Sequence, residues 1–168
     1  MKSAISVFMV LALCFSQVAC TEASIINDIE IAAQAASVAV PIVLGSAGVA
    51  PEVVSYVAAA NKALGCAATA AQGGGSEASV AAAVVACLSS AAYPLIPAGT
   101  DQAVANAVAA VATDIQQVIK EYTANAVQLK AMPAQWNPSF SDRRHIAHIQ
   151  KLVNKNAALF ASKGVYGK

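Results

Sequence analysis

A long heptad pattern in the second half of the chain constrains the fold more than any other sequence feature. Between Val104 and Leu129, apolar side chains recur at alternating spacings of four and three residues, with one polar interruption at Asn125. Such spacing is typical of an α-helix that buries one stripe of its surface. We therefore predict one long helix over this range, with Thr100 as its N-cap residue. The stripe consists of Val104, Val108, Val111, Ile115, Val118, Tyr122, Asn125 and Leu129.

The stripe needs a covering partner, and two sources are open. A second copy of the chain could pair with it as a coiled coil, with Asn125 fixing the register, which would make a homo-oligomer through the Val104–Leu129 seam. Alternatively, helices of the same chain cover it. We favour the same chain, because its first half contains alanine-rich helical faces that themselves need covering.

Alanine supplies most of the other hydrophobic positions. The chain is 58% hydrophobic but only 5% aromatic, and alanine is the best helix former. Runs that alternate β-branched or aromatic residues with polar ones are almost absent, so strands have little support. The sequence predicts an all-α fold, namely an alanine-rich helical bundle of four helices followed by a basic amphipathic helix. The first three helices are expected at 24–44, from 51 to before the triglycine at 73–75, and at 76–90, with Ser24 and Ser76 as N-cap residues.

Residues 1–19 have the pattern of a secretory signal peptide. Lys2 precedes the apolar run from Ala4 to Phe15, and the small residues Val18 and Ala19 follow. A short apolar run between a basic start and small residues is typical of export signals and is too short to span a bilayer. We therefore expect an exported protein.

The tetrapeptide QVAC at residues 17–20 resembles the lipobox of bacterial lipoproteins. In that motif, a cysteine that follows a small residue receives a lipid and becomes the new N-terminus. The resemblance covers four residues and departs at Gln17, where the motif usually has leucine. It implies lipidation of Cys20 and anchoring to a membrane on the periplasmic side of the bacterial cell envelope. Ordinary cleavage after Cys20 or after Ala23, which would give a secreted protein, stays an alternative.

Beyond Cys20, two cysteines remain in the chain, Cys66 and Cys87. An oxidising compartment favours a disulfide between them, and two buried free thiols are the alternative. The closed loop of about 20 residues predicts roughly 3 kcal/mol of stabilisation. Because Cys66 lies nearer the triglycine than Cys87 does, we expect the second helix to end early, near residues 67–69, so that the two sulfur atoms can meet.

The bundle, at residues 20–131, is expected to join the last helix through a proline-containing linker at residues 132–138. Trp136 lies in this linker. We expect the indole to fold back over an edge of the core. An exposed contact with a membrane or a ligand is the alternative.

The last segment, residues 139–168, is strongly basic. It has six basic residues against Asp142 alone, whereas residues 20–138 have three basic residues against eight acidic ones. An apolar stripe is expected along Ile146, Ile149, Leu152, Val153 and Phe160, and a polar side with Arg143, Arg144, Lys151 and Lys155. This pattern predicts contact with an anionic membrane, an envelope polyanion or an acidic protein partner. Return of the helix to the protein's own acidic body is equally compatible with the charges.

Nothing in the sequence resembles an active site. His145 and His148 are expected to be solvated, no metal-ligand spacing occurs, and neither glycine-rich stretch matches a nucleotide-binding loop. We therefore expect no cofactor, no metal and no enzymatic activity. Nucleic acid is not an expected partner, because no aromatic stacking platform is present.

Two other function classes stay open. The uncharged stretches Ile31–Ala50 and Ala78–Gly99 are long enough to span a bilayer, which would fit a small pore-former or holin-like permeabiliser. A secreted helical ligand carrier is the third alternative, and it would need a cavity that alanine packing disfavours. The favoured hypothesis is a cell-envelope lipoprotein with a structural or binding role.

Overall fold

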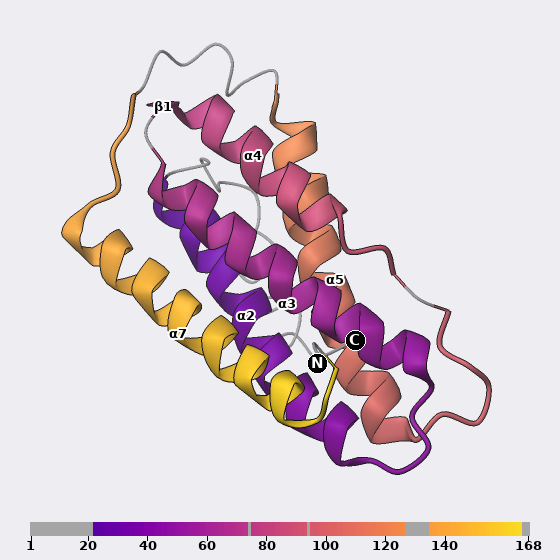
Figure 1. Cartoon of the computed structure of the whole chain (residues 1–168). Helices are drawn as coiled ribbons and strands as arrows, with labels where there is room; N and C mark the ends of the chain where they lie inside the picture. Colours follow the sequence, from indigo (N-terminus) through magenta and orange to yellow (C-terminus); the bar gives the residue numbers. More distant parts are fainter. Residues whose placement is uncertain (1–21, 74, 94, 127–134, 166–168) are drawn as a thin grey trace, which may run out of the picture.

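A computed structural model describes residues 22–73, 75–93, 95–126 and 135–165. The described chain forms five helices and two very short strands, which confirms the predicted all-α class (Figure 1). The helices are α2 (Glu22–Gly45), α3 (Pro51–Gln72), α4 (Glu77–Ser89), α5 (Gln102–Ala124) and α7 (Phe140–Ser162). The strands β1 (Gly75–Ser76) and β2 (Gln135–Trp136) pair antiparallel.

The helices form three layers. α2 and α3 lie in the middle, α7 packs against both of them on one side, and α5 and α4 cover the other side. Within that second covering layer, α5 lies mainly on α2, and α4 lies mainly on α3. α7 therefore belongs to the bundle as an outer helix that contacts both central helices.

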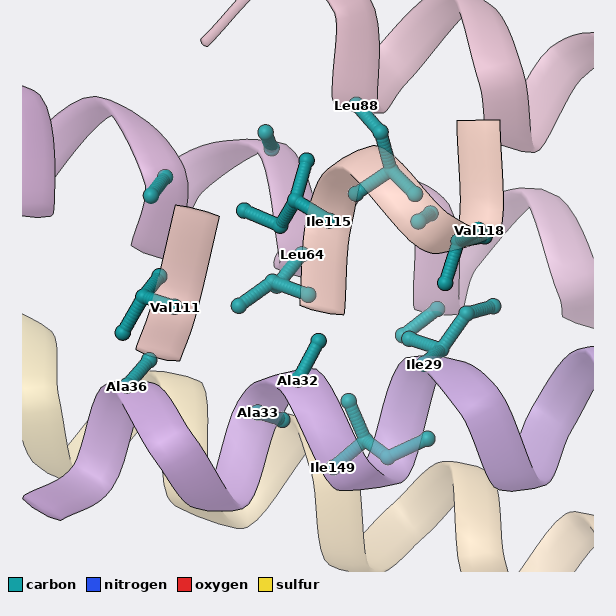
Figure 2. Packing of buried hydrophobic residues seen from close by; sticks show 14 of the residues in the cluster. Ile29, Ala32, Ala33, Ala36, Leu64, Leu88, Val111, Ile115, Val118 and Ile149 are labelled. Carbon is teal, nitrogen blue, oxygen red and sulfur yellow. The ribbon is translucent and has the colours of Figure 1, made fainter. Parts of the chain in front are cut away.

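Small side chains allow the central layer to pack closely. Ala32, Ala33 and Ala36 of α2 have no exposed surface, and they lie among larger side chains from α3, α5 and α7 (Figure 2). Gly65 of α3 lets α7 approach, because a Cβ atom at this position would lie 3.1 Å from Cγ1 of Val153. The alanine-rich sequence thus fills the core by bringing the helices close together, and not by interlocking large side chains.

The heptad stripe is buried inside its own chain. Six of its members have at most 2% of their surface exposed: Val104, Val108, Val111, Ile115, Val118 and Tyr122. They face the other helices of the bundle, as favoured, and are not exposed to a second copy. The prediction for Asn125 is wrong, because α5 ends at Ala124 and Asn125 is its C-cap residue. Leu129 lies outside the described residues.

Several helices begin at residues with local capping interactions, and two of the predicted N-cap residues are wrong. α4 begins after Ser76 as expected, and Pro51 occupies the first turn of α3. α2 begins at Glu22, ahead of the predicted cap at Ser24. The cap of α5 is Asp101 and not Thr100, since Asp101 Oδ1 accepts hydrogen bonds from the N–H groups of Ala103 (2.9 Å) and Val104 (3.3 Å). A carboxylate has the further advantage of a negative charge at the positive end of the helix.

A disulfide joins Cys66 of α3 to Cys87 of α4, with Cα atoms 5.6 Å apart. The predicted Cys66–Cys87 pair thus lies within disulfide distance. The predicted early end of the second helix is wrong, because α3 continues to Gln72. The link at residues 73–76 is extended where the structure describes it, with ψ of 154° at Gly73 and 152° at Ser76. Extended residues advance about 3.3 Å each, so α4 can start beyond the end of α3, and this offset aligns the two cysteines.

Trp136 folds back onto the core, as expected. Its side chain is 2% exposed, and Nε1 donates a 2.8 Å hydrogen bond to the carbonyl oxygen of Ala71 at the end of α3. β2 also pairs with β1 between α3 and α4. The described part of the predicted linker is therefore attached to the body just before α7 begins.

The two predicted bilayer-spanning stretches have different outcomes. Ala78–Gly99 is not one helix, because α4 ends at Ser89, and its 13 residues extend about 20 Å against a hydrocarbon thickness of about 30 Å. Ile31–Ala50 also runs past a helix end, because α2 ends at Gly45. Among the described helices, however, residues Ile25–Gly45 of α2 alone are long and apolar enough to cross a membrane. One face of this segment is buried in the bundle, at Ile25, Ile29, Ala32, Ala36, Val40 and Val43.

Candidate functional site

The two faces of α7 have different surroundings. Ile146, Ile149 and Phe160 have no exposed surface, and Leu152 and Val153 are partly buried against the core formed with α2 and α3. The predicted apolar stripe therefore covers the protein's own body. An insertion of these side chains into a bilayer is incompatible with this packing.

The predicted basic residues lie on the opposite, solvent-facing side of α7. Arg143, Arg144, Lys151 and Lys155 are all exposed, and we call these four residues the basic face. Arg144, His148, Lys151 and Lys155 follow one another at spacings of four, three and four, which places them along one line of the helix. With Asp142 as the one acidic residue of α7, four positive charges minus one leave a net charge of +3.

The first turn of α7 is fixed by a capping box. The Ser139 N–H donates to Asp142 Oδ2 at 2.8 Å, and the Asp142 N–H donates to Ser139 Oγ at 3.2 Å. Arg143 Nε donates to the carbonyl oxygen of Pro138 at 3.2 Å, which holds this guanidinium beside the helix start. These bonds give the basic face a rigid beginning.

Buried amides fix the rotation of α7 about its axis. Asn156 Nδ2 donates to Asn61 Oδ1 of α3 at 3.0 Å, and Asn61 Nδ2 donates to the carbonyl oxygen of Val153 at 3.1 Å. Both amides are 1% exposed. Sequence reasoning missed this pair. The available signal was Asn156 itself, which lies seven residues after Ile149 and so belongs to the buried stripe of the helix.

A second contact joins α7 to α2. His145 Nδ1 lies 2.5 Å from Glu30 Oε2, and these two residues line a shallow hollow of about 350 Å³ with Arg144 and His148. His145 was expected to be solvated; it is exposed, but it also contacts this carboxylate. Among the described residues, no group of three or more His, Cys, Asp or Glu side chains is arranged to hold a metal ion.

Two acidic residues of the body, Asp28 and Glu121, lie in surroundings that do not involve the basic face. Tyr122 Oη donates a 3.0 Å hydrogen bond to Asp28 Oδ2, and burial raises the pKa of Asp28. Burial and the nearby charge of Asp28 raise the pKa of Glu121. Lys151 and Lys155 form no ion pair with any residue that the structure describes. The acidic body therefore does not neutralise the middle of the basic face.

The structure brings together only part of the predicted site. Arg143, Arg144, Lys151 and Lys155 share one helix face, while Cys66 and Cys87 lie elsewhere, between α3 and α4. Cys20, the predicted lipidation site, lies outside the described residues. Comparison with protein-family models, curated proteins and solved structures finds no match to this chain.

Proposed function

We propose that this protein is an exported, non-catalytic cell-envelope lipoprotein whose α7 binds an anionic membrane surface. One observation carries the proposal: α7 buries its apolar stripe in the bundle and directs all four residues of the basic face to solvent. A helix of this kind binds an anionic membrane surface through its positive charges and does not insert into the bilayer.

Electrostatics sets the strength of such binding. Each Lys or Arg close to an anionic leaflet contributes about 1 kcal/mol, so the four side chains together supply up to about 4 kcal/mol. That energy gives reversible binding that weakens as salt screens the charges. Lipidation of Cys20, implied by the lipobox resemblance, would provide the durable attachment, and the basic face would then orient the bundle on the surface.

Vesicle sedimentation tests the charge contribution. The exported chain with Cys20→Ser, which carries no lipid, is mixed with vesicles of neutral phosphatidylcholine or of phosphatidylcholine with phosphatidylglycerol. We expect binding only to the anionic vesicles and release at high salt. The triple variant Arg144→Gln, Lys151→Gln, Lys155→Gln should bind on the order of a hundredfold more weakly, since three contributions of about 1 kcal/mol are lost.

Lys120→Gln is the matched control for Lys151→Gln, because Lys120 is an exposed lysine on a different helix, α5. The control should leave vesicle binding unchanged, whereas Lys151→Gln should weaken it about fivefold. Equal loss in both variants would mean that net charge, and not the basic face, governs binding. Binding to soluble polyphosphate without binding to anionic vesicles would replace the membrane by an envelope polyanion as partner.

A further inference from the structure

A cleft between α4 and α5 lies apart from the basic face. Its volume is about 280 Å³, and its walls include Ala78, Ala82, Val85 and Ala86 from α4 and Tyr122 and Thr123 from α5. The residues from α4 recur at helical spacing, so they form one continuous face of that helix. None of the described residues that line the cleft is charged.

α4 is unusually apolar for a helix in the outer layer. From Ala78 to Leu88 its only hydroxyl or amide side chain is that of Ser79, and Cys87 is engaged in the disulfide. A helix that is apolar on all sides is normally buried on all sides. α4 packs on α3 and α5, yet Ala82 and Ala86 remain exposed beside the cleft.

A disulfide and a hydrogen bond keep the two walls of the cleft apart. The disulfide at Cys87 holds α4 on α3 immediately after Ala86, so α4 cannot readily move to close the gap. The Tyr122 phenol is held by its hydrogen bond to Asp28 of α2. The alanine side chains of the wall are too short to fill the space themselves. The walls are therefore preorganised, which lowers the cost of binding a ligand.

We propose that this cleft binds the hydrocarbon part of a small apolar molecule, such as a medium-length acyl chain. An apolar cavity of about 150 Å³ accommodates benzene, so by proportion the cleft holds roughly ten carbon atoms. Of the described lining residues, Tyr122 and Thr123 carry hydroxyl groups, and that of Tyr122 donates a hydrogen bond to Asp28. The polar head of a ligand would therefore stay in solvent. This chemistry has two sources, a free molecule or, resting on the proposed function, the lipid on Cys20 of the same protein.

Isothermal titration calorimetry with decanoic acid tests this proposal. The exported chain with Cys20→Ser should bind decanoate with a negative heat-capacity change, because apolar surface is buried. Ala82→Leu places extra carbon atoms in the cleft and should weaken binding at least tenfold. The matched control Ala83→Leu changes the next residue, which is exposed and does not line the cleft, and it should bind like the unmodified chain.

Comparing decanoate binding by the lipidated protein and by the Cys20→Ser chain identifies the source of the acyl chain. If lipidated protein fails to bind decanoate while the Cys20→Ser chain binds it, the protein's own acyl chain occupies the cleft. If both bind, the ligand is a free molecule. Absence of binding to the Cys20→Ser chain, or equal affinity of Ala82→Leu and Ala83→Leu, would overturn the proposal. Circular dichroism melting of both variants checks that each remains folded. Ala82→Leu leaves the basic face intact, so vesicle binding tests the proposed function separately.

Discussion

Asn61 and Asn156 are buried amides that come from different helices of the described core. In the coiled-coil alternative, the sequence pattern gave another asparagine, Asn125, the role of fixing the register, because it interrupts the heptad stripe. The structure uses Asn125 to end α5, where a short polar side chain is common. Asn156 could have been recognised from its position on the apolar stripe of α7. Its partner Asn61 could not, since that pairing depends on how α3 and α7 meet.

We predict that Asn156→Ala lowers the free energy of unfolding by about 1–3 kcal/mol. The substitution removes the donor for Asn61 Oδ1 and leaves a buried acceptor without that bond. Asn154→Ala is the matched control, because Asn154 is exposed on the same helix, and it should change stability by less than about 0.5 kcal/mol. Urea denaturation of both variants measures the difference. Equal stability of the two variants would show that the buried amides contribute nothing specific.

At the scale of the element, the α3–α4 hairpin shows where helical periodicity alone is insufficient. Periodicity and capping predicted the start of α4 at Ser76, because the cap is a local interaction of Ser76 Oγ with the Ser79 N–H. The predicted end of α3 near residues 67–69 is wrong, because α3 continues to Gln72 and the offset between Cys66 and Cys87 comes from the link that follows it. Gly75 has φ of +139°, and a Cβ atom there would lie 2.7 Å from Ser79 Oγ. Glycine thus permits the extended link that shifts α4 along α3.

We predict that reducing the disulfide lowers the free energy of unfolding by about 3 kcal/mol, the value expected for a loop of this length. α4 should respond most, since it is the shortest helix of the described bundle and packs mainly on two of its helices, α3 and α5. Hydrogen exchange followed by mass spectrometry should show faster exchange in Glu77–Ser89 than in α2 after reduction. The double variant Cys66→Ala, Cys87→Ala should behave like the reduced protein. A denaturation midpoint that does not move on reduction would contradict this prediction.

At the scale of the whole molecule, the all-α class followed from alanine content and helical periodicity, which are local properties. The heptad stripe also showed that α5 needed covering by other helices. The position of α7 in the bundle could not be predicted from these local properties. Its apolar stripe and its charges permitted either a membrane contact or a return to the body, and the choice depends on the surface that α2 and α3 together offer to α7. That surface exists only after the other helices have assembled.

Processing of the N-terminus determines whether the whole molecule is anchored. We predict that the intact mass of the protein from its native host corresponds to a chain that begins at Cys20 and carries acyl chains. The physical reason is the export pattern of residues 1–19 together with the QVAC resemblance. On reduction, the mass should increase by that of two hydrogen atoms, because Cys66 and Cys87 are paired. A mass that begins at Thr21 or Ser24 would indicate a free exported protein, in which the basic face alone provides membrane contact. A mass that begins at Met1 would refute cleavage, keep residues 4–19 in the mature chain, and favour a membrane-inserted protein over the proposed lipoprotein.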